Sequence, residues 1–195
     1  VSCDNSAQQN EINKSEMDAA LTRAEQSSGN ISELPLNFEF GMTRDEVNKH
    51  LEKLVKRGVI SKMGNKYYDY DYVLESGQKV ETHIETAFYE DRLYDLYFSL
   101  YGNEFNYEFI AAIDEEITNK VDSTYKRISH YMLDYDDSKM WIIRWFKENQ
   151  YIYLRNAHGT DIHFVNAPIE KIASEAGRRK LLEKARMKAG TEVKN

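Results

Sequence analysis

The segment NKYYDYDYVLESGQKVETHIETAFYEDRLYDLYFSLY, residues 65–101, decides the fold. Polar and apolar side chains alternate along three runs, which are separated by residues 76–78 and by residues 90–91. Alternation of this kind is typical of strands whose two faces meet different surroundings, and short turns favour antiparallel pairing. We therefore predict a three-stranded antiparallel meander over about residues 67–74, 79–88 and 92–101.

A helix is predicted just before this meander. Thr43 is a favourable N-cap, and Glu46 follows it at the spacing of a capping box. Gly58 provides a stop signal after two basic residues. Apolar residues recur at helical spacing between these signals, at Val47, Leu51, Leu54 and Val55.

The second half of the chain repeats this order. A helix over 104–122 is followed by strands at about 125–135, 139–147, 151–157 and 161–165, and Pro168 opens a last helix with Ile172 and Leu182 facing inward. We predict an α+β protein with antiparallel sheet(s) of about six to seven strands and helices on one face. Residues 34–102 and 103–195 are the two predicted helix–meander units.

The first 33 residues differ from the rest in composition. Residues 4–33 are rich in Asn, Ser, Gln and Glu, which predicts a polar tether. A short helix over 15–26 is compatible with the shared face of Met17, Ala20, Leu21 and Ala24. The only cysteine is Cys3, so an internal disulfide bond is excluded.

The order Val1-Ser2-Cys3 resembles the end of a bacterial lipoprotein signal, in which small residues precede a cysteine that becomes lipidated. The resemblance implies a signal remnant, lipidation of Cys3, and a location in the bacterial cell envelope, at the outer membrane or the periplasmic face. The alternative is a leftover thiol in a disordered tail.

Residues 40–51, FGMTRDEVNKHL, carry a second resemblance. They are similar to the helix-start motif of small outer-membrane lipoproteins of the SmpA/OmlA type, which belong to the β-barrel assembly machinery. The match spans at best residues 38–101, and the doubled layout is similar to β-lactamase inhibitor protein. This resemblance implies a fold and the binding of other proteins, without naming a partner.

The charge distribution bears on the partner class. The net charge is −7, but residues 178–195 hold 7 basic and 2 acidic residues, which leaves −12 on the remainder. Because phosphate contacts dominate nucleic-acid affinity, a body this acidic predicts no nucleic-acid partner. The basic C-terminal stretch is most simply a helix end, with docking on the acidic body or on anionic lipid as alternatives.

A winged-helix DNA-binding protein is one functional alternative. Residues 47–60, VNKHLEKLVKRGVI, resemble a recognition helix followed by a wing, and residues 44–66 hold 7 basic and 3 acidic residues. A helix-turn-helix needs a further helix just upstream, whereas residues 34–41, LPLNFEFG, are predicted to be extended.

Catalytic and cofactor motifs are not found, so we expect no enzyme activity, no cofactor and no classical metal motif. A three-residue turn at 76–78 would place Asp71 opposite His83 and Asp69 opposite Glu85. These four residues form a candidate cation-binding or hydrolytic cluster, because hard cations take several carboxylate oxygens. The alternative is a solvated outer face on which His83 bonds to Asp71.

An aromatic patch is the candidate partner surface. A two-residue turn at 148–149 would pair Trp145 with Ile152, and Ile143 with Leu154. Aromatic and arginine side chains dominate protein-interaction hot spots. The candidate partner-binding residues are Trp141, Arg144, Trp145, Tyr151 and Tyr153, and the alternative is that both faces are buried. Together these features predict an exported, membrane-anchored, non-enzymatic module that binds a protein partner in the envelope.

Overall fold

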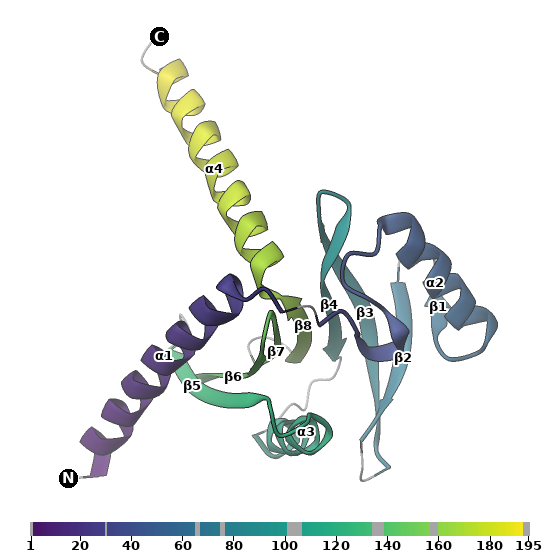
Figure 1. Cartoon of the computed structure of the whole chain (residues 1–195), viewed down its shortest axis with the longest axis horizontal. Coiled ribbons are helices and arrows are strands. Elements are labelled where there is room, and N and C mark those ends of the chain that lie inside the picture. Colours follow the sequence, from purple (N-terminus) through teal and green to yellow (C-terminus); the bar gives the residue numbers. More distant parts are fainter. Residues whose placement is uncertain are drawn as a thin grey trace.

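The computed structural model describes residues 2–29, 31–64, 67–74, 77–100, 107–133, 139–156 and 160–192. Four α-helices and eight strands lie within these ranges (Figure 1). The helices are α1 (Ser2–Gln26), α2 (Arg44–Lys56), α3 (Tyr107–Lys120) and α4 (Ala167–Glu192), with a 3-10 turn at Pro35–Asn37. The strands are β1 (Ser61–Met63), β2 (Tyr67–Val73), β3 (Lys79–Tyr89), β4 (Arg92–Leu100), β5 (Lys126–Leu133), β6 (Lys139–Lys147), β7 (Gln150–Asn156) and β8 (Thr160–Asn166).

The strands form a single antiparallel sheet in the order β1-β2-β3-β4-β8-β7-β6-β5. Each half of the chain contributes a four-stranded meander, and the two meanders join where β4 pairs with β8. The α+β class and the antiparallel sheet are confirmed, but the described residues form eight strands rather than six to seven. The prediction missed β1, whose three residues are all exposed and are too few to show alternation.

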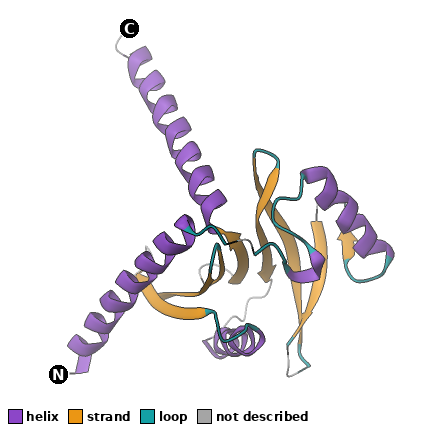
Figure 2. Ribbon diagram, viewed as in Figure 1, coloured by secondary structure: helices purple, strands orange, loops and turns teal. Residues whose placement is uncertain are grey.

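Helices α2 and α3 pack on one face of the sheet, α2 over the first meander and α3 over the second meander and the adjoining parts of β3 and β4 (Figure 2). Apolar residues of alternate strand positions lie under them, because successive side chains of a strand point to opposite faces. Under α2 these include Ile84, Leu93, Leu96 and Phe98, and under α3 they include Leu100, Ile143, Trp145, Ile152, Leu154 and Ile162.

The predicted capping box fixes the start of α2. The Thr43 hydroxyl accepts a hydrogen bond from the Glu46 amide at 3.3 Å, and the Glu46 carboxylate accepts one from the Thr43 amide at 2.8 Å. The helix then buries Val47, Leu51 and Leu54, as its spacing predicted. Residues 38–43 ahead of α2 form no helix, so the helix-turn-helix arrangement is not present at that position.

Helix α1 corrects two predictions. The short helix considered over 15–26 is part of a longer helix that also takes in residues predicted as a polar tether, and this helix packs on the face opposite α2 and α3 (Figures 1 and 2). Helices therefore lie on both faces of the sheet. Met17 is completely buried and Ala20 and Ala24 nearly so, against Ile128, Ile142 and Phe146. The polar composition hid this helix because only one narrow stripe of it is buried.

Helix α4 begins directly after β8, next to Pro168, where the start of the last helix was predicted. It projects away from the sheet (Figure 1). Two apolar residues of this helix were predicted to face inward, but Ile172 is 50% and Leu182 is 55% exposed, so that prediction was wrong. The helix leaves the body after its first turns, so these positions meet no sheet surface. Among the described residues, no helix combines the length and the apolar character that crossing a membrane requires.

Candidate functional site

The candidate site lies on the α1 and α4 side of the sheet, where β3, β4, β8 and β7 run side by side. Except for Val165, the apolar residues of β4 and β8 point toward α2 and α3, so the intervening polar residues share the other face. Strand pairing places Tyr97 opposite His163, and Ser99 opposite Asp161. We call this surface the central polar face, and define it as Glu85, Asp95, Tyr97, Ser99, Tyr153, Arg155, Asp161 and His163.

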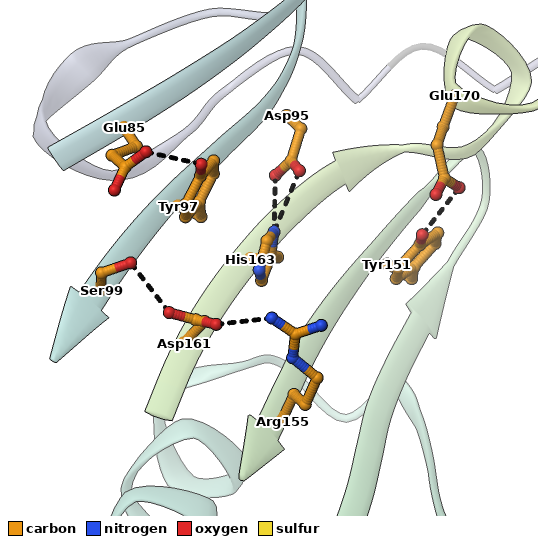
Figure 3. A network of polar contacts seen from close by, with 9 residues as sticks. All are labelled: Glu85, Asp95, Tyr97, Ser99, Tyr151, Arg155, Asp161, His163 and Glu170. Carbon is orange, nitrogen blue, oxygen red and sulfur yellow. Dashed lines mark hydrogen bonds and ion pairs between the residues drawn. The ribbon is translucent and has the colours of Figure 1, made fainter. Parts of the chain in front are cut away.

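An imidazole is the centre of the central polar face. Nδ1 of His163 lies 2.9 Å from a carboxylate oxygen of Asp95 (Figure 3). The ring is stacked on Tyr97, with centroids 4.5 Å apart and planes 14° from parallel, and Tyr153 lies 5.6 Å from it on the neighbouring strand. The side chains of His163 and Asp95 are both 15% exposed, so packing fixes the orientation of the imidazole.

Tyr97 is held at its other end by Glu85. Its phenol donates a 2.7 Å hydrogen bond to the carboxylate of Glu85 (Figure 3). Burial raises the pKa of Tyr97 above its ordinary value, and the bond to the carboxylate raises it further. Tyr97 is therefore a neutral hydrogen-bond donor at physiological pH, not a proton acceptor.

The carboxylate of Asp161 bonds to side chains of the two neighbouring strands, β4 and β7. One of its oxygens accepts a 2.8 Å hydrogen bond from the Ser99 hydroxyl, and the other accepts a 2.9 Å bond from the Arg155 guanidinium (Figure 3). The hydrogen bond to Asp161 raises the pKa of Arg155, against the opposing effect of burial. The charge pair is thus a fixed part of the surface.

The central polar face continues to the base of α4. The Tyr151 phenol donates a 2.7 Å hydrogen bond to Glu170 in the first turns of α4 (Figure 3). The Arg144 guanidinium lies 5.2 Å from the ring centroid of Tyr151 and 4.7 Å from that of Tyr153, within cation–π range. Two tyrosines therefore hold an arginine at the border of the face.

The predicted cation cluster does not converge in the structure. Asp69 is opposite His83, with which it pairs directly, while Asp71 is opposite Glu81. Asp71 pairs instead with Lys79 at 3.5 Å, and Glu85 bonds to Tyr97. The hairpin register differs by two residues from the predicted one, so the polar residues share the predicted face but have different partners. Within the described part of the chain, no three His, Cys, Asp or Glu residues gather as metal ligands would.

The predicted aromatic patch is divided between two faces. The pairing of Trp145 with Ile152 is as predicted, but Trp145 is 1% exposed in the core beneath α3. Tyr151 is 2% exposed in the core beneath α1. Tyr153 belongs to the central polar face, Arg144 and Tyr151 lie at its border, and Trp141 is half-buried on the opposite face of β6. The side chain of Cys3 lies outside the described residues.

Sequence reasoning missed most of the central polar face. The alternation in RLYDLYFSL, residues 92–100, and in TDIHFVN, residues 160–166, already placed Asp95, Tyr97 and Ser99 on one face and Asp161 and His163 on one face. The pairing of β4 with β8 could not be read in the same way, because no short turn connects these strands.

The hydrogen bonds of the central polar face make it a rigid surface, which favours the recognition of a binding partner. Each carboxylate of the central polar face accepts a hydrogen bond from a neighbouring side chain, so the polar groups keep fixed positions while their rings remain half-buried. Comparison of the chain with protein-family models, with curated proteins and with solved structures finds no match.

Proposed function

We propose that this chain is a non-enzymatic protein-interaction module of the bacterial cell envelope, and that the central polar face binds its protein partner. The observation that carries the proposal is the stack of Tyr97, His163 and Tyr153, with the imidazole held by Asp95. Tyr and Arg are enriched in binding hot spots, and side chains already fixed in place lose little conformational entropy on binding.

The hydrogen bonds of the face favour binding over acid–base chemistry. A general base must reach the proton of a substrate, whereas the carboxylates of Glu85, Asp95 and Asp161 already accept hydrogen bonds from protein groups. The raised pKa of Tyr97 keeps its phenol protonated, so its phenolate is not populated as a general base. These observations support a recognition surface.

A lipid anchor on Cys3 is the second part of the proposal. It rests on the resemblance of Val1-Ser2-Cys3 to a lipoprotein signal and of residues 38–101 to SmpA/OmlA-type lipoproteins. Helix α1 begins at Ser2, and its N-terminal end lies away from the sheet (Figure 1). The order α2 then β1–β4, and α3 then β5–β8, supports the further proposal of two helix–meander units, residues 34–102 and 103–195.

Co-purification from cells after mild crosslinking tests the proposal. The variant Tyr153→Ser/Arg155→Glu alters the half-exposed part of the central polar face. The matched control is Lys53→Glu, at an exposed position of α2. We expect the recovered partner to fall at least about tenfold with the first variant and to be unchanged with the second. Equal recovery with both variants, each shown to be folded, would contradict the proposal.

A further inference from the structure

Helix α1 lies along the free edge of β5, which is the last strand of the sheet. The side-chain amide of Asn10 donates a 3.1 Å hydrogen bond to the carbonyl of Tyr131 and accepts a 2.8 Å bond from its amide. One turn later, Asn13 donates a 2.9 Å bond to the carbonyl of Ser129. Two asparagines therefore make the hydrogen bonds that a ninth strand would make.

The bonded positions alternate along β5. The backbone groups of Ser129 and Tyr131 point away from β6, and alternate residues with outward groups are what an added strand requires. An unprotected edge of this kind pairs readily with another extended chain. In this protein α1 protects the edge, as long as it stays in place.

The N-terminal part of α1 is held by few contacts. From residue 8 onward, Met17 is its one large apolar side chain that is fully buried within the described residues. His130 is also buried on this face, with no hydrogen-bond partner for Nδ1 among the described residues. Imperfect packing of this kind makes local opening less costly than global unfolding.

The C-terminal end of α1 is fixed more firmly. Glu25 forms a 2.8 Å ion pair with Lys171 of α4, and the Ile31 amide donates a 3.0 Å bond to the side chain of Asn149. Gly29 lies so close to Glu148 that an added Cβ would be 2.6 Å from that residue's Cβ. The connecting segment 27–29 is thus attached to the sheet.

We propose that α1 is a displaceable guard of the β5 edge, and that an acidic extended strand of a partner protein adds to the sheet there when α1 moves away. The charges support this occupant: Lys126 at the start of β5 is half-exposed, and α1 already places Glu16 at 3.9 Å from it, whereas the neighbouring Arg127 is paired with Asp114 of α3. A strand with acidic side chains would replace both the hydrogen bonds and the charge that α1 supplies. This edge is separate from the central polar face, so the two proposals can fail independently.

The first test is amide hydrogen exchange measured by NMR on the full chain. The variant Asn10→Ala/Asn13→Ala removes the guard contacts, and Ser15→Ala/Thr22→Ala changes two exposed polar residues of the same helix as a matched control. We expect exchange of the Tyr131 amide to rise at least about tenfold in the first variant alone. The single variant Asn10→Ala provides the same readout if the double variant does not fold. An unchanged exchange rate would overturn the guard role.

The second test is binding of a labelled peptide, followed by fluorescence anisotropy. The probe has eight residues, with alternating valine and threonine and a glutamate at each end. We expect it to bind the opened variant at least about tenfold more tightly than the control, and more tightly than the same peptide with lysine ends. The inference is overturned if neither peptide binds although exchange has risen, or if the opened variant instead forms a dimer through its own edge.

Discussion

The carboxylate of Asp95 lies 2.9 Å from Nδ1 of His163, although 68 positions separate the two residues in the chain. Asp95 belongs to the last strand of the first meander and His163 to the last strand of the second. Their contact therefore ties the two halves of the sheet together and seats the imidazole against Tyr97.

Replacing Asp95 tests this contact. We expect Asp95→Ala to lower the free energy of unfolding by about 1–3 kcal/mol, because it leaves a mostly buried imidazole without its partner. Asp71→Ala is the matched control, since the ion pair of Asp71 with Lys79 is exposed and should contribute less than about 0.5 kcal/mol. Urea denaturation measures both. Equal losses would show that the Asp95–His163 contact has no special role in joining the meanders.

The register of the first hairpin makes a second prediction. A double-mutant cycle between Asp69→Asn and His83→Gln should give a coupling energy of about 0.5 kcal/mol or more, because the two side chains are paired and largely buried. The cycle between Asp71→Asn and His83→Gln should give a coupling near zero, since Asp71 is opposite Glu81. Coupling of His83 to Asp71 instead of to Asp69 would support the register predicted from the sequence, in which Asp71 is opposite His83.

The two tryptophans should differ in their contribution to stability. Trp145 is 1% exposed and its indole donates a 3.1 Å hydrogen bond to Thr118, so we expect Trp145→Ala to cost about 3–5 kcal/mol. Trp141 is half-buried, and Trp141→Ala should cost less. Chemical denaturation monitored by circular dichroism measures the difference. Similar losses would mean that the two aromatic faces are equally buried.

His130 makes stability depend on pH. Burial lowers the pKa of His130 below its ordinary value of 6.5, and the nearby charge of Arg144 lowers it further; Lys14 on α1 acts in the same direction, opposed there by Asp18 and Glu11. The unfolded chain then binds a proton that the folded chain does not, so stability is present above about pH 6.5 and is lost as the pH falls toward the lowered pKa. Unfolding free energies at about pH 7.5 and about pH 5 should therefore differ, and His130→Leu should reduce the difference. An unchanged pH dependence in that variant would contradict the assignment.

The sequence predicted the positions of the strands better than the pairing between them. Alternation located β2, β3 and β4, and it assigned Tyr70 and Asp71 to opposite faces. It could not decide between registers two residues apart, because both place the same side chains on the same face. The Leu74 amide donates a 2.9 Å hydrogen bond to the Gln78 carbonyl, whereas the predicted turn at 76–78 would include Gln78.

Two parts of the fold had weak local signals. From residue 8 onward, helix α1 buries one methionine and two alanines, so its composition resembled a disordered tether. The central polar face depends on the pairing of β4 with β8, whose residues come from different halves of the chain. Such long-range pairing is set by the packing of the whole sheet, and no turn or periodicity in the sequence records it.

Site-specific photocrosslinking in cells tests the central claim most directly. A photoreactive amino acid replaces Tyr153 on the central polar face and, as a control, Lys53 at an exposed position of α2. The account predicts a discrete protein adduct from position 153, lost when Arg155→Glu is added, and no such adduct from position 53. Adducts that are equal at both positions, or that persist with Arg155→Glu, would contradict a partner-binding role for the central polar face.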